Sequence, residues 1–382
     1  MRPSVTVGVA LALLSCSLNG RGSHEGPFPQ DGGDSGGVDA GGSGGFPGSD
    51  AAVLLPYAYR RRLHVEASNG QLPTGLTVSF ELDHAALVAA GKCAADGHDL
   101  RVLRRESGKL VEVTRVLALG ASWASATTRI EFSLLADVTT PTDDSYYVYY
   151  GDNEAGMADE DRSHVYLVWD DFEDGTLDPH WKLSQIGGAV GLLNQDAGKL
   201  HIEALGDDIG GTSDELVLVS REVSGDFVAD CRVAASGGAL GADAKVGGVM
   251  VRQSLDAGSQ QRIAAPMNGA AAFTNAYRVA PGGDTAQDTV PGPNPIPAFA
   301  RVTRLGQSSR AWRSADGESW EEIGTAMTFT GLSDPVRVGV PLANRDTKSL
   351  GWVDVDWFRV RRWVEPAPSV TLDAEEPGPF SR

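Results

Sequence analysis

The feature that most constrains this chain is a series of short segments in which apolar and polar side chains alternate. In residues 76–82 every second side chain is apolar. Near the C-terminus Val353, Val355 and Trp357 fall on one face of a predicted strand, and Phe358 falls on the other. A period of two is typical of strands that bury one face. Because the segments are short and Gly- and Pro-containing turns separate them, the sequence predicts an all-β fold.

The length of 382 residues predicts two domains, since single domains usually hold about 100 to 200 residues. We expect a β-sandwich domain over residues 55–155 and a second one over residues 165–365. Residues 1–16 are expected to be a signal peptide and residues 17–50 a disordered Gly/Ser linker. Residues 366–382 are expected to form a disordered tail.

The N-terminus has the pattern of an export signal. Arg2 precedes an apolar run over residues 5–14, which is about half of the ~20 residues that a membrane-spanning helix needs. The run ends in Leu-Leu-Ser before Cys16, which resembles a bacterial lipobox. The resemblance implies lipidation of Cys16, membrane attachment through that lipid, and a location in the cell envelope, at the outer membrane or cell surface. The alternative is an ordinary secreted protein that is cleaved nearby.

The predicted linker is rich in Gly, Ser and Asp and holds almost no aliphatic side chains. It cannot bury enough apolar surface to offset the entropy lost on ordering, so the sequence predicts a flexible tether. Gly-Asp-Ser-Gly-Gly at 33–37 and Gly-Gly-Ser-Gly-Gly at 41–45 match serine-hydrolase patterns. A tether without a strand or a helix cannot hold a serine against a base, so we assign neither motif a function.

Charge and cysteine content limit the possible function classes. The net charge is −19, from 32 Lys and Arg against 51 Asp and Glu, and it is spread along the chain. Such a surface repels polyanions, so no nucleic-acid partner is expected. Cys93 and Cys231 fall in different predicted domains. They form either one disulfide bridge or two buried free thiols.

A short helix is predicted inside the first domain, with Asp83 as its N-cap, the Ala-rich run 85–90 as its body and Gly91 as its stop. Two other segments, 96–101 (Asp-Gly-His-Asp-Leu-Arg) and 149–152 (Tyr-Tyr-Gly-Asp), resemble a bacterial surface domain of unknown function that ends in a Tyr-Tyr-Gly-Asn strand. The last residue here is Asp where that family usually has Asn. The resemblance implies a β-sandwich and supplies no catalytic residues.

Four short motifs in the second domain resemble the concanavalin A-like lectin/glucanase superfamily in its laminin-G-like form. They are Asp171 to Gly175 with Trp181, Gly248 to Ser254, Ser314 to Trp320, and Val355 to Val360. The resemblance implies a jelly roll of two curved antiparallel sheets, often with a sugar site on its concave face or rim.

Sugars present flat apolar faces edged by hydroxyl groups, so a sugar site needs exposed aromatic rings beside groups that form hydrogen bonds. Trp312, Trp320, Tyr277 and Arg252 are the candidate ligand-binding residues, and the Pro- and Gly-rich segment 281–297 is a candidate rim loop. The alternative is structural: Trp320 follows an Asp-Gly turn and packs on its sheet, and Trp312 lies in the core.

Asp171, Glu173 and Asp356 are candidate ligands of a structural calcium ion. The resemblance implies that the opening and closing strands of the jelly roll lie side by side, and Ca²⁺ binds carboxylate oxygens. The alternative is that these residues are solvated surface carboxylates. No other cofactor is indicated.

These observations favour a lipid-anchored cell-envelope protein that binds a polysaccharide or surface glycan, or mediates adhesion, without catalysis. No catalytic residues are assigned: Glu81 and Asp83 begin the carboxylate motif of laminarinase-type glycosidases, but Ala86 occupies its third acidic position. Two alternatives stay open. One is a glycoside hydrolase or lyase with acids on separate strands, for which Glu173 and Glu215 are candidates, and the other is a structural protein that binds other envelope proteins.

Overall fold

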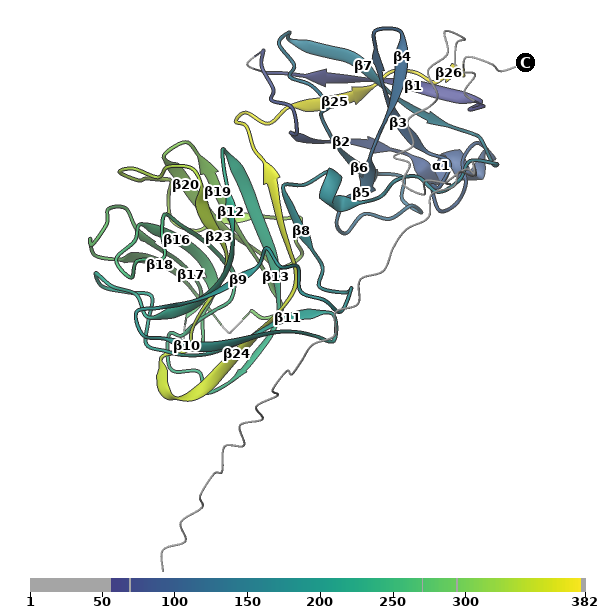
Figure 1. Cartoon of the computed structure of the whole chain (residues 1–382). Helices are drawn as coiled ribbons and strands as arrows, with labels where there is room; N and C mark the ends of the chain where they lie inside the picture. The colour runs from purple at the N-terminus through teal and green to yellow at the C-terminus, as the bar shows by residue number, and fades with distance from the viewer. Residues whose placement is uncertain (1–55, 69, 270, 293–294, 379–382) are drawn as a thin grey trace, which may run out of the picture. The chain divides into compact units, whose positions relative to one another are not determined.

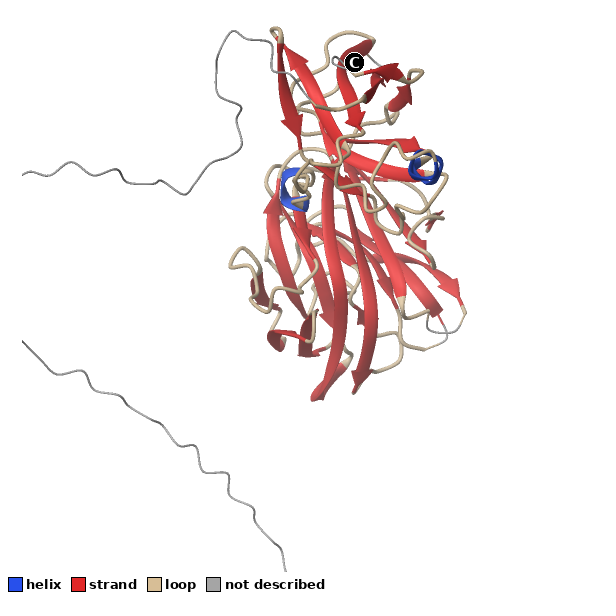
Figure 2. Cartoon of the chain, turned by 90° about the vertical axis from the view of Figure 1, so that its right-hand side faces the viewer, coloured by secondary structure: helices blue, strands red, loops and turns tan. Residues whose placement is uncertain are grey.

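The computed structural model describes residues 56–68, 70–269, 271–292 and 295–378. Nearly all regular structure in these residues is antiparallel strand, with one α-helix and one short 3-10 helix (Figure 2). The predicted all-β class is therefore confirmed. No helix in the described ranges has the length and apolar character that crossing a membrane requires. The predicted signal peptide, Cys16 and the linker lie outside the described residues.

The first sandwich consists of two antiparallel sheets that pack face to face (Figure 1). The six-stranded sheet has the order β25-β1-β7-β3-β4, with β26 also paired to β1, and the three-stranded sheet has the order β2-β6-β5. Both sheets contribute apolar side chains to one buried cluster, including Leu63, Phe80, Phe132 and Val148. The strands are β1 (Tyr59–Glu66), β2 (Thr77–Leu82), β3 (Arg101–Glu106), β4 (Lys109–Val113), β5 (Arg115–Leu117), β6 (Thr128–Ser133), β7 (Thr142–Tyr150), β25 (Ser369–Leu372) and β26 (Glu376–Pro377).

The predicted helix is present as α1 (His84–Ala89). The Asp83 carboxylate accepts a hydrogen bond from the backbone N–H of Ala86 at 2.9 Å, which satisfies one of the free donors of the first turn. Gly91 follows with a φ of 66°, a left-handed conformation that glycine adopts without strain. The cap, the helix and the stop that the sequence predicted are all confirmed. The remaining helical turn is η1 (Arg162–His164).

The predicted disordered tail is wrong for residues 369–377, which form β25 and β26 on the edge of the first sandwich. Leu372 pairs with Leu63, and Glu376 pairs with Arg60. The physical reason is that β1 would otherwise expose a row of unpaired backbone donors and acceptors. Val370 and Leu372 also pack against the first core. The first domain is therefore completed by the C-terminal end of the chain.

The second sandwich has a nine-stranded sheet with the order β10-β11-β24-β13-β19-β20-β21, to which β8 and β22 add (Figure 1). Its strands are β8 (Val168–Asp170), β10 (Val190–Asp196), β11 (Lys199–Gly206), β13 (Phe227–Gly238), β19 (Ala298–Leu305), β20 (Ser308–Ser314), β21 (Glu321–Glu322), β22 (Met327–Thr328) and β24 (Asp346–Arg362).

An eight-stranded sheet with the order β18-β17-β16-β15-β23-β12-β9 faces it, with β14 paired to β23. The strands are β9 (Lys182–Ile186), β12 (Leu216–Val223), β14 (Lys245–Val246), β15 (Val249–Arg252), β16 (Gln261–Pro266), β17 (Ala271–Arg278), β18 (Ala286–Pro291) and β23 (Val336–Ala343). Two large antiparallel sheets in one sandwich are the arrangement that the resemblance to a jelly roll implied.

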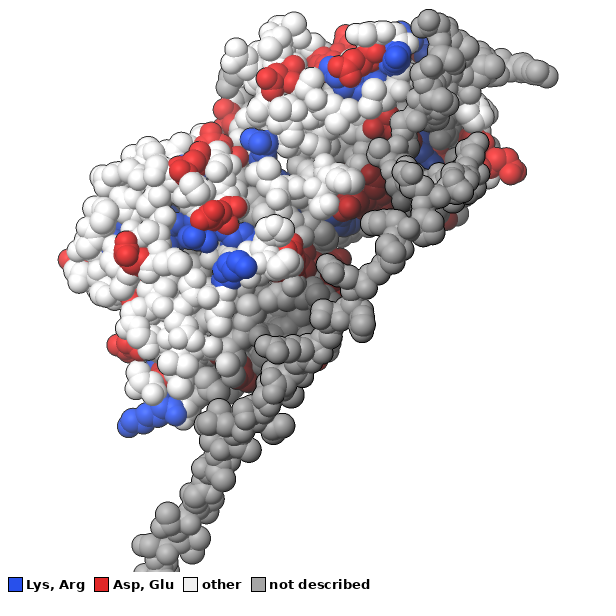
Figure 3. Space-filling model, in the orientation of Figure 1, with Lys and Arg blue, Asp and Glu red and all other residues white. Residues whose placement is uncertain are grey.

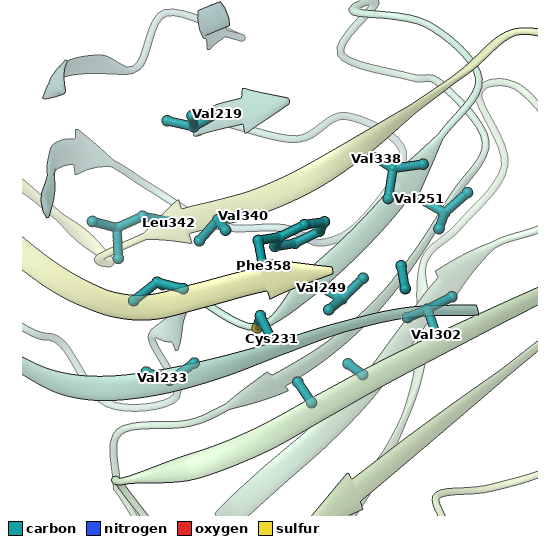
Figure 4. Close-up of a cluster of buried hydrophobic side chains, with 14 of the residues drawn as sticks. Val219, Cys231, Val233, Val249, Val251, Val302, Val338, Val340, Leu342 and Phe358 are labelled. Atoms are coloured by element: carbon teal, nitrogen blue, oxygen red, sulfur yellow. The ribbon is translucent and has the colours of Figure 1, made fainter. Parts of the chain in front are cut away.

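The core of the second sandwich lies between these sheets (Figure 4). Val219, Val249 and Val340 come from the eight-stranded sheet. Cys231 and Phe358 come from the nine-stranded sheet. Each fully buried aliphatic or aromatic side chain of this kind contributes about 1.5–3 kcal/mol to folding, so the core is the main stabilising element of the domain.

A β-bulge changes the predicted alternation in β24. Arg232 on β13 pairs with Trp357, but the next residue, Val233, pairs with Val355, so one extra residue is inserted into β24. Val353, Val355 and Phe358 therefore all face the core, whereas Trp357 lies outside it. The prediction that Trp357 shares a face with the two valines was wrong, because simple alternation does not register an inserted residue.

The two cysteines within the described part of the chain are free thiols. Cys93 belongs to the core of the first sandwich and Cys231 to that of the second. The Cys93 thiol donates a hydrogen bond to the Asp99 carboxylate at 3.0 Å. Burial raises the pKa of both thiols well above the ordinary range, so both are inert core groups. Of the two open alternatives, the buried free thiols are confirmed.

Candidate functional site

The outer face of the eight-stranded sheet is covered by three chain segments. Its central side chains, including Met250 and Ile263, are fully buried. The covering segments are 207–214, 253–260 and 280–285. Backbone hydrogen bonds link them to one another. The N–H groups of Asp214, Gly282 and Thr285 donate to the carbonyl oxygens of Ala257, Gly258 and Gly211, in that order. Because these segments cover the centre of the face, the side chains buried there are not open to a ligand.

Arg252 lies under this cover and is not a ligand-binding residue. Its guanidinium and that of Arg278 both contact the Asp214 carboxylate, at 2.7 Å and 2.6 Å, and all three side chains are fully buried. Arg252 also donates to the backbone carbonyl of Ser254, and Arg278 to that of Gly283. The prediction was wrong because the charge that suggested ligand binding is neutralised by Asp214 and holds the covering segments together.

Tyr277 is partly buried and packs against the core of the second sandwich. It pairs in register with Arg262, which in turn pairs with the core residue Val251, so Tyr277 points between the two sheets. The Arg262 guanidinium lies 5.5 Å from the centre of the Tyr277 ring and donates to the backbone carbonyl of Ser309 at 2.7 Å. Burial lowers the pKa of Arg262 to about 10. The Arg262 side chain therefore connects the two sheets, and the partly exposed Tyr277 ring lies beside it, outside the lining of the depression described below.

The two predicted tryptophans differ in their surroundings. Trp312 pairs with Arg301 on the outer face of the nine-stranded sheet, and its indole N–H is buried with no hydrogen-bond partner among the described residues. The ring of Trp320 lies over the same Arg301, with the guanidinium carbon 3.6 Å from the ring centre. The Trp320 indole donates to the backbone carbonyl of Gly317 at 3.1 Å, which fixes its orientation. Both tryptophans thus flank Arg301.

A surface depression with a volume of about 440 Å³ lies beside Trp320. Among the four predicted ligand residues, Trp320 alone belongs to its lining. The lining consists of Phe273, Pro295, Ala298, Arg313, Ser314, Ala315, Asp316, Ser319, Trp320 and Glu321. It combines apolar rings with hydroxyl, guanidinium and carboxylate groups.

The turn that borders the depression is held by Asp316. One oxygen of its carboxylate accepts hydrogen bonds from the backbone N–H groups of Ser319 at 2.7 Å and Glu318 at 2.8 Å, and from the Ser314 hydroxyl at 2.8 Å. These donors hold the pKa of Asp316 well below its ordinary value, so the group stays ionised. The turn therefore presents Trp320 from a fixed loop.

A salt bridge between Arg313 and Glu321 forms another part of the lining. The Nη2 and Nε atoms of Arg313 lie 2.8 Å and 2.9 Å from Glu321 Oε2. The pair is partly exposed, so both side chains face solvent at the depression. Sequence reasoning singled out the motif from Ser314 to Trp320 but missed Arg313 and Glu321, which flank it. The sequence pattern did not predict that Arg313 and Glu321 pair across two neighbouring strands, β20 and β21.

The three predicted calcium ligands are not assembled into a metal site. Asp356 pairs with Lys199 at 2.7 Å and also with Arg232. Asp171 and Glu173 are exposed, and Asp171 accepts a long hydrogen bond of 3.4 Å from the backbone N–H of Glu173. Within the described residues no cluster of three or more His, Cys, Asp or Glu side chains is placed to hold a metal ion.

The candidate catalytic acids are far apart. Glu173 lies beside Gly198, and Glu215 lies beside Gly206. Gly198 directly precedes β11, and Gly206 is the last of its 8 residues. At about 3.3 Å per residue the two ends of β11 are roughly 25 Å apart. A glycosidase needs its two carboxylates about 5–9 Å apart, so the structure does not bring Glu173 and Glu215 together.

Acidic and basic side chains are interspersed on the face shown in Figure 3, rather than gathered into one patch. This distribution agrees with a net charge of −19 that is spread along the sequence. The charge pattern visible there singles out no anion-binding surface.

No protein-family model matches the chain, and no curated protein matches it. Among solved structures, a functionally unknown protein from Saccharomyces cerevisiae is 20% identical, over 51% of this chain and 97% of that one, with a TM-score of 0.37. A xylan beta-1,4-xylosidase from Bacillus halodurans is 14% identical, over 51% of this chain and 39% of that one, with a TM-score of 0.38. A laminarinase from Flavobacterium is 9% identical, over 52% of this chain and 100% of that one, with a TM-score of 0.34. At such identities and TM-scores none of these similarities bears on activity.

Proposed function

We propose that the second sandwich binds a glycan, without catalysis, in the depression beside Trp320. The observation that carries this proposal is the combination of an aromatic ring held by a fixed turn with an exposed Arg313–Glu321 pair in one lining. A sugar ring stacks its apolar C–H face on an aromatic side chain while its hydroxyl groups donate to and accept from the neighbouring polar groups.

The chemistry of the lining favours a neutral sugar. Arg313 is paired with Glu321, and Asp316 adds a further negative charge, so the lining has no unpaired cation. An acidic sugar would meet this charge and the overall net charge of −19. A neutral glycan meets no such repulsion.

Replacement of Trp320 tests the proposal. We expect Trp320→Ala to lower affinity for the recognised neutral glycan at least about tenfold, because one stacked aromatic ring is lost. The full chain is screened on a glycan array, and the affinity of the best ligand is then measured by calorimetry for both proteins.

Trp312→Phe is the matched control, because Trp312 lies next to the same Arg301, is absent from the lining and makes no hydrogen bond through its indole. Retained affinity in Trp320→Ala, or an equal loss in the control, would contradict the assignment of the depression. Release of reducing sugars from the bound glycan would contradict the absence of catalysis.

The cell-envelope location belongs to the same proposal. The sequence ending at Cys16 supports export and lipid attachment, which would display the sandwich outside the cytoplasm. Metabolic labelling with a fatty acid is expected to mark the full chain and to leave Cys16→Ser unlabelled. Labelling of the Ser variant would contradict attachment at Cys16.

A further inference from the structure

An apolar patch lies at the end of the nine-stranded sheet where β10, β11 and β24 run side by side. Val190 and Leu192 on β10 are 52% and 60% exposed, and Leu350 on β24 is 40% exposed. Leu192 is aligned with Glu203 on β11, which is aligned with Trp352 on β24. These residues point away from the core, since their neighbours Gly191 and Val353 face inward. We call this region the Trp352 surface.

Trp352 lies against the backbone of the neighbouring strand β13, at the position of two glycines. A Cβ atom on Gly237 would lie 2.6 Å from Cζ2 of Trp352, and one on Gly238 would lie 3.1 Å from Cδ1. Gly237 is also the residue aligned with Trp352 across the two strands. The ring occupies the space that side chains at these two positions would fill, and it remains partly exposed. The backbone of β13 therefore supports a Trp ring at the sheet surface.

Polar groups border the ring. His201 lies with its ring centre 5.7 Å from that of Trp352. Its Nδ1 atom lies 2.6 Å from an oxygen of Asp354, and its Nε2 atom lies 3.6 Å from one of Glu203. Burial alone would lower the pKa of His201, but the hydrogen bond to Asp354 raises it above the ordinary value. Carboxylate and imidazole groups thus stand beside the ring, as they do in sites that bind hydroxyl groups.

Two observations argue against a second copy of this chain as the occupant. On the edge strand β10, where another strand could add, the Gly191 carbonyl already accepts a hydrogen bond from the Gln185 side-chain amide at 3.3 Å. The whole chain carries −19, so a second copy meets a like net charge. The same charge disfavours an anionic lipid surface.

We propose that the Trp352 surface is a second contact site for a neutral polysaccharide chain, separate from the depression beside Trp320. Trp352 and Leu192 contact the apolar faces of sugar rings, and Asp354, Glu203 and His201 form hydrogen bonds with hydroxyl groups. The site extends the proposed function and rests on the same class of ligand. Two contacts on one domain bind a polymer more tightly than a short oligosaccharide, because the second contact is made at high effective concentration.

Trp352→Ala tests the site directly. The full chain is incubated with laminarin, xylan and cellulose, with alginate as an acidic comparison, and the retained fraction is measured. We expect Trp352→Ala to lower retention on the recognised neutral polymer about tenfold, the effect of about 1.4 kcal/mol. Its affinity for a disaccharide of the same polymer is expected to stay unchanged.

Leu350→Asp tests the same surface while the Trp352 ring is kept. Leu255→Asp is its matched control, since both leucines are 40% exposed. Leu255 lies outside the Trp352 surface, in the segment that covers the other sheet. Only Leu350→Asp is expected to weaken retention. Thermal unfolding of each variant separates loss of the site from loss of the fold.

The outcomes separate this inference from the proposed function. Loss of polymer retention in Trp352→Ala, with disaccharide binding intact, supports the second site. Unchanged retention in Trp352→Ala together with loss in Trp320→Ala overturns the second site and leaves the depression in place. A wild-type chain that binds no neutral glycan on the array and retains none of the polymers overturns the proposed function itself. A dimer in sedimentation that Leu350→Asp dissociates overturns the inference in favour of self-association.

Discussion

The two outer faces of the second sandwich differ in what covers them. The centre of the eight-stranded sheet's outer face is covered by three segments, and the Asp214 carboxylate holds Arg252 and Arg278 beneath them. At the Trp352 surface of the nine-stranded sheet, aliphatic side chains are exposed and the Trp352 ring is partly exposed. Segments that pack over a sheet thus turn part of its outer face into a second core, whereas a surface without such a cover keeps apolar side chains that can meet a ligand.

The largest expected effect comes from opening the closed face. Asp214→Ala leaves Arg252 and Arg278 fully buried without their carboxylate, so we expect it to lower the free energy of unfolding by about 3–5 kcal/mol. Urea unfolding followed by tryptophan fluorescence measures the change. Asp284→Ala is the control, since Asp284 is exposed on one of the covering segments. A loss below about 1 kcal/mol for Asp214→Ala would mean that the covering segments do not depend on this ion pair.

Truncation of one apolar side chain on each outer face measures how far the two faces differ in burial. Met250 is fully buried beneath the covering segments, whereas Leu192 is 60% exposed at the Trp352 surface. Met250→Ala is expected to cost about 2–5 kcal/mol, because it leaves a cavity. Leu192→Ala is expected to change stability by less than about 0.5 kcal/mol. Equal costs in thermal and chemical unfolding would show that the two faces are covered to the same extent.

The smallest expected effect is on the pH dependence of stability, through His201 at the Trp352 surface. The folded-state pKa of His201 is raised, so the protonated form is the one that folding favours. Its contribution is fully present below the ordinary histidine pKa of about 6.5 and is lost as pH rises through the raised value. Because His201 is partly exposed, we expect the contribution to stay below about 1 kcal/mol.

Unfolding of wild type and His201→Gln between pH 5 and pH 9, roughly the range in which histidine titrates, measures this contribution. The stability difference should be largest at the acidic end and smallest at the alkaline end. A difference that grows with pH would show that the neutral form of His201 is the one that folding favours. In that case the group beside the Trp352 ring would be a neutral imidazole rather than an imidazolium.

Several local features could be predicted because neighbouring residues alone determine them. Asp83 caps α1 through a hydrogen bond to a residue only three positions away, and Gly91 ends the helix through its own backbone freedom. The Asp-Gly turn before Trp320 is likewise built from contacts within its own segment. Trp320 is accordingly the predicted ligand residue that the structure places in the depression.

Other features were predicted wrongly because the residues that decide them lie far away in the chain. Arg252 was expected to contact a ligand, but Asp214 is 38 residues away in sequence and neutralises it. The strand from Ser369 to Leu372 was hidden among prolines and acids, and its pairing partner lies near the other end of the chain.

Strand alternation and helix capping act over a few residues, so the sequence predicted the all-β class, the first helix with its caps, and the Asp-Gly turn before Trp320. The covering of the eight-stranded sheet, the bulge that turns Trp357 out of the core and the pairing of residues 369–372 with β1 depend on the folded chain. The physical reason is that burial and charge neutralisation depend on partners that meet only after folding. A residue type indicates what a side chain can do, and its distant neighbours decide whether it is free to do it.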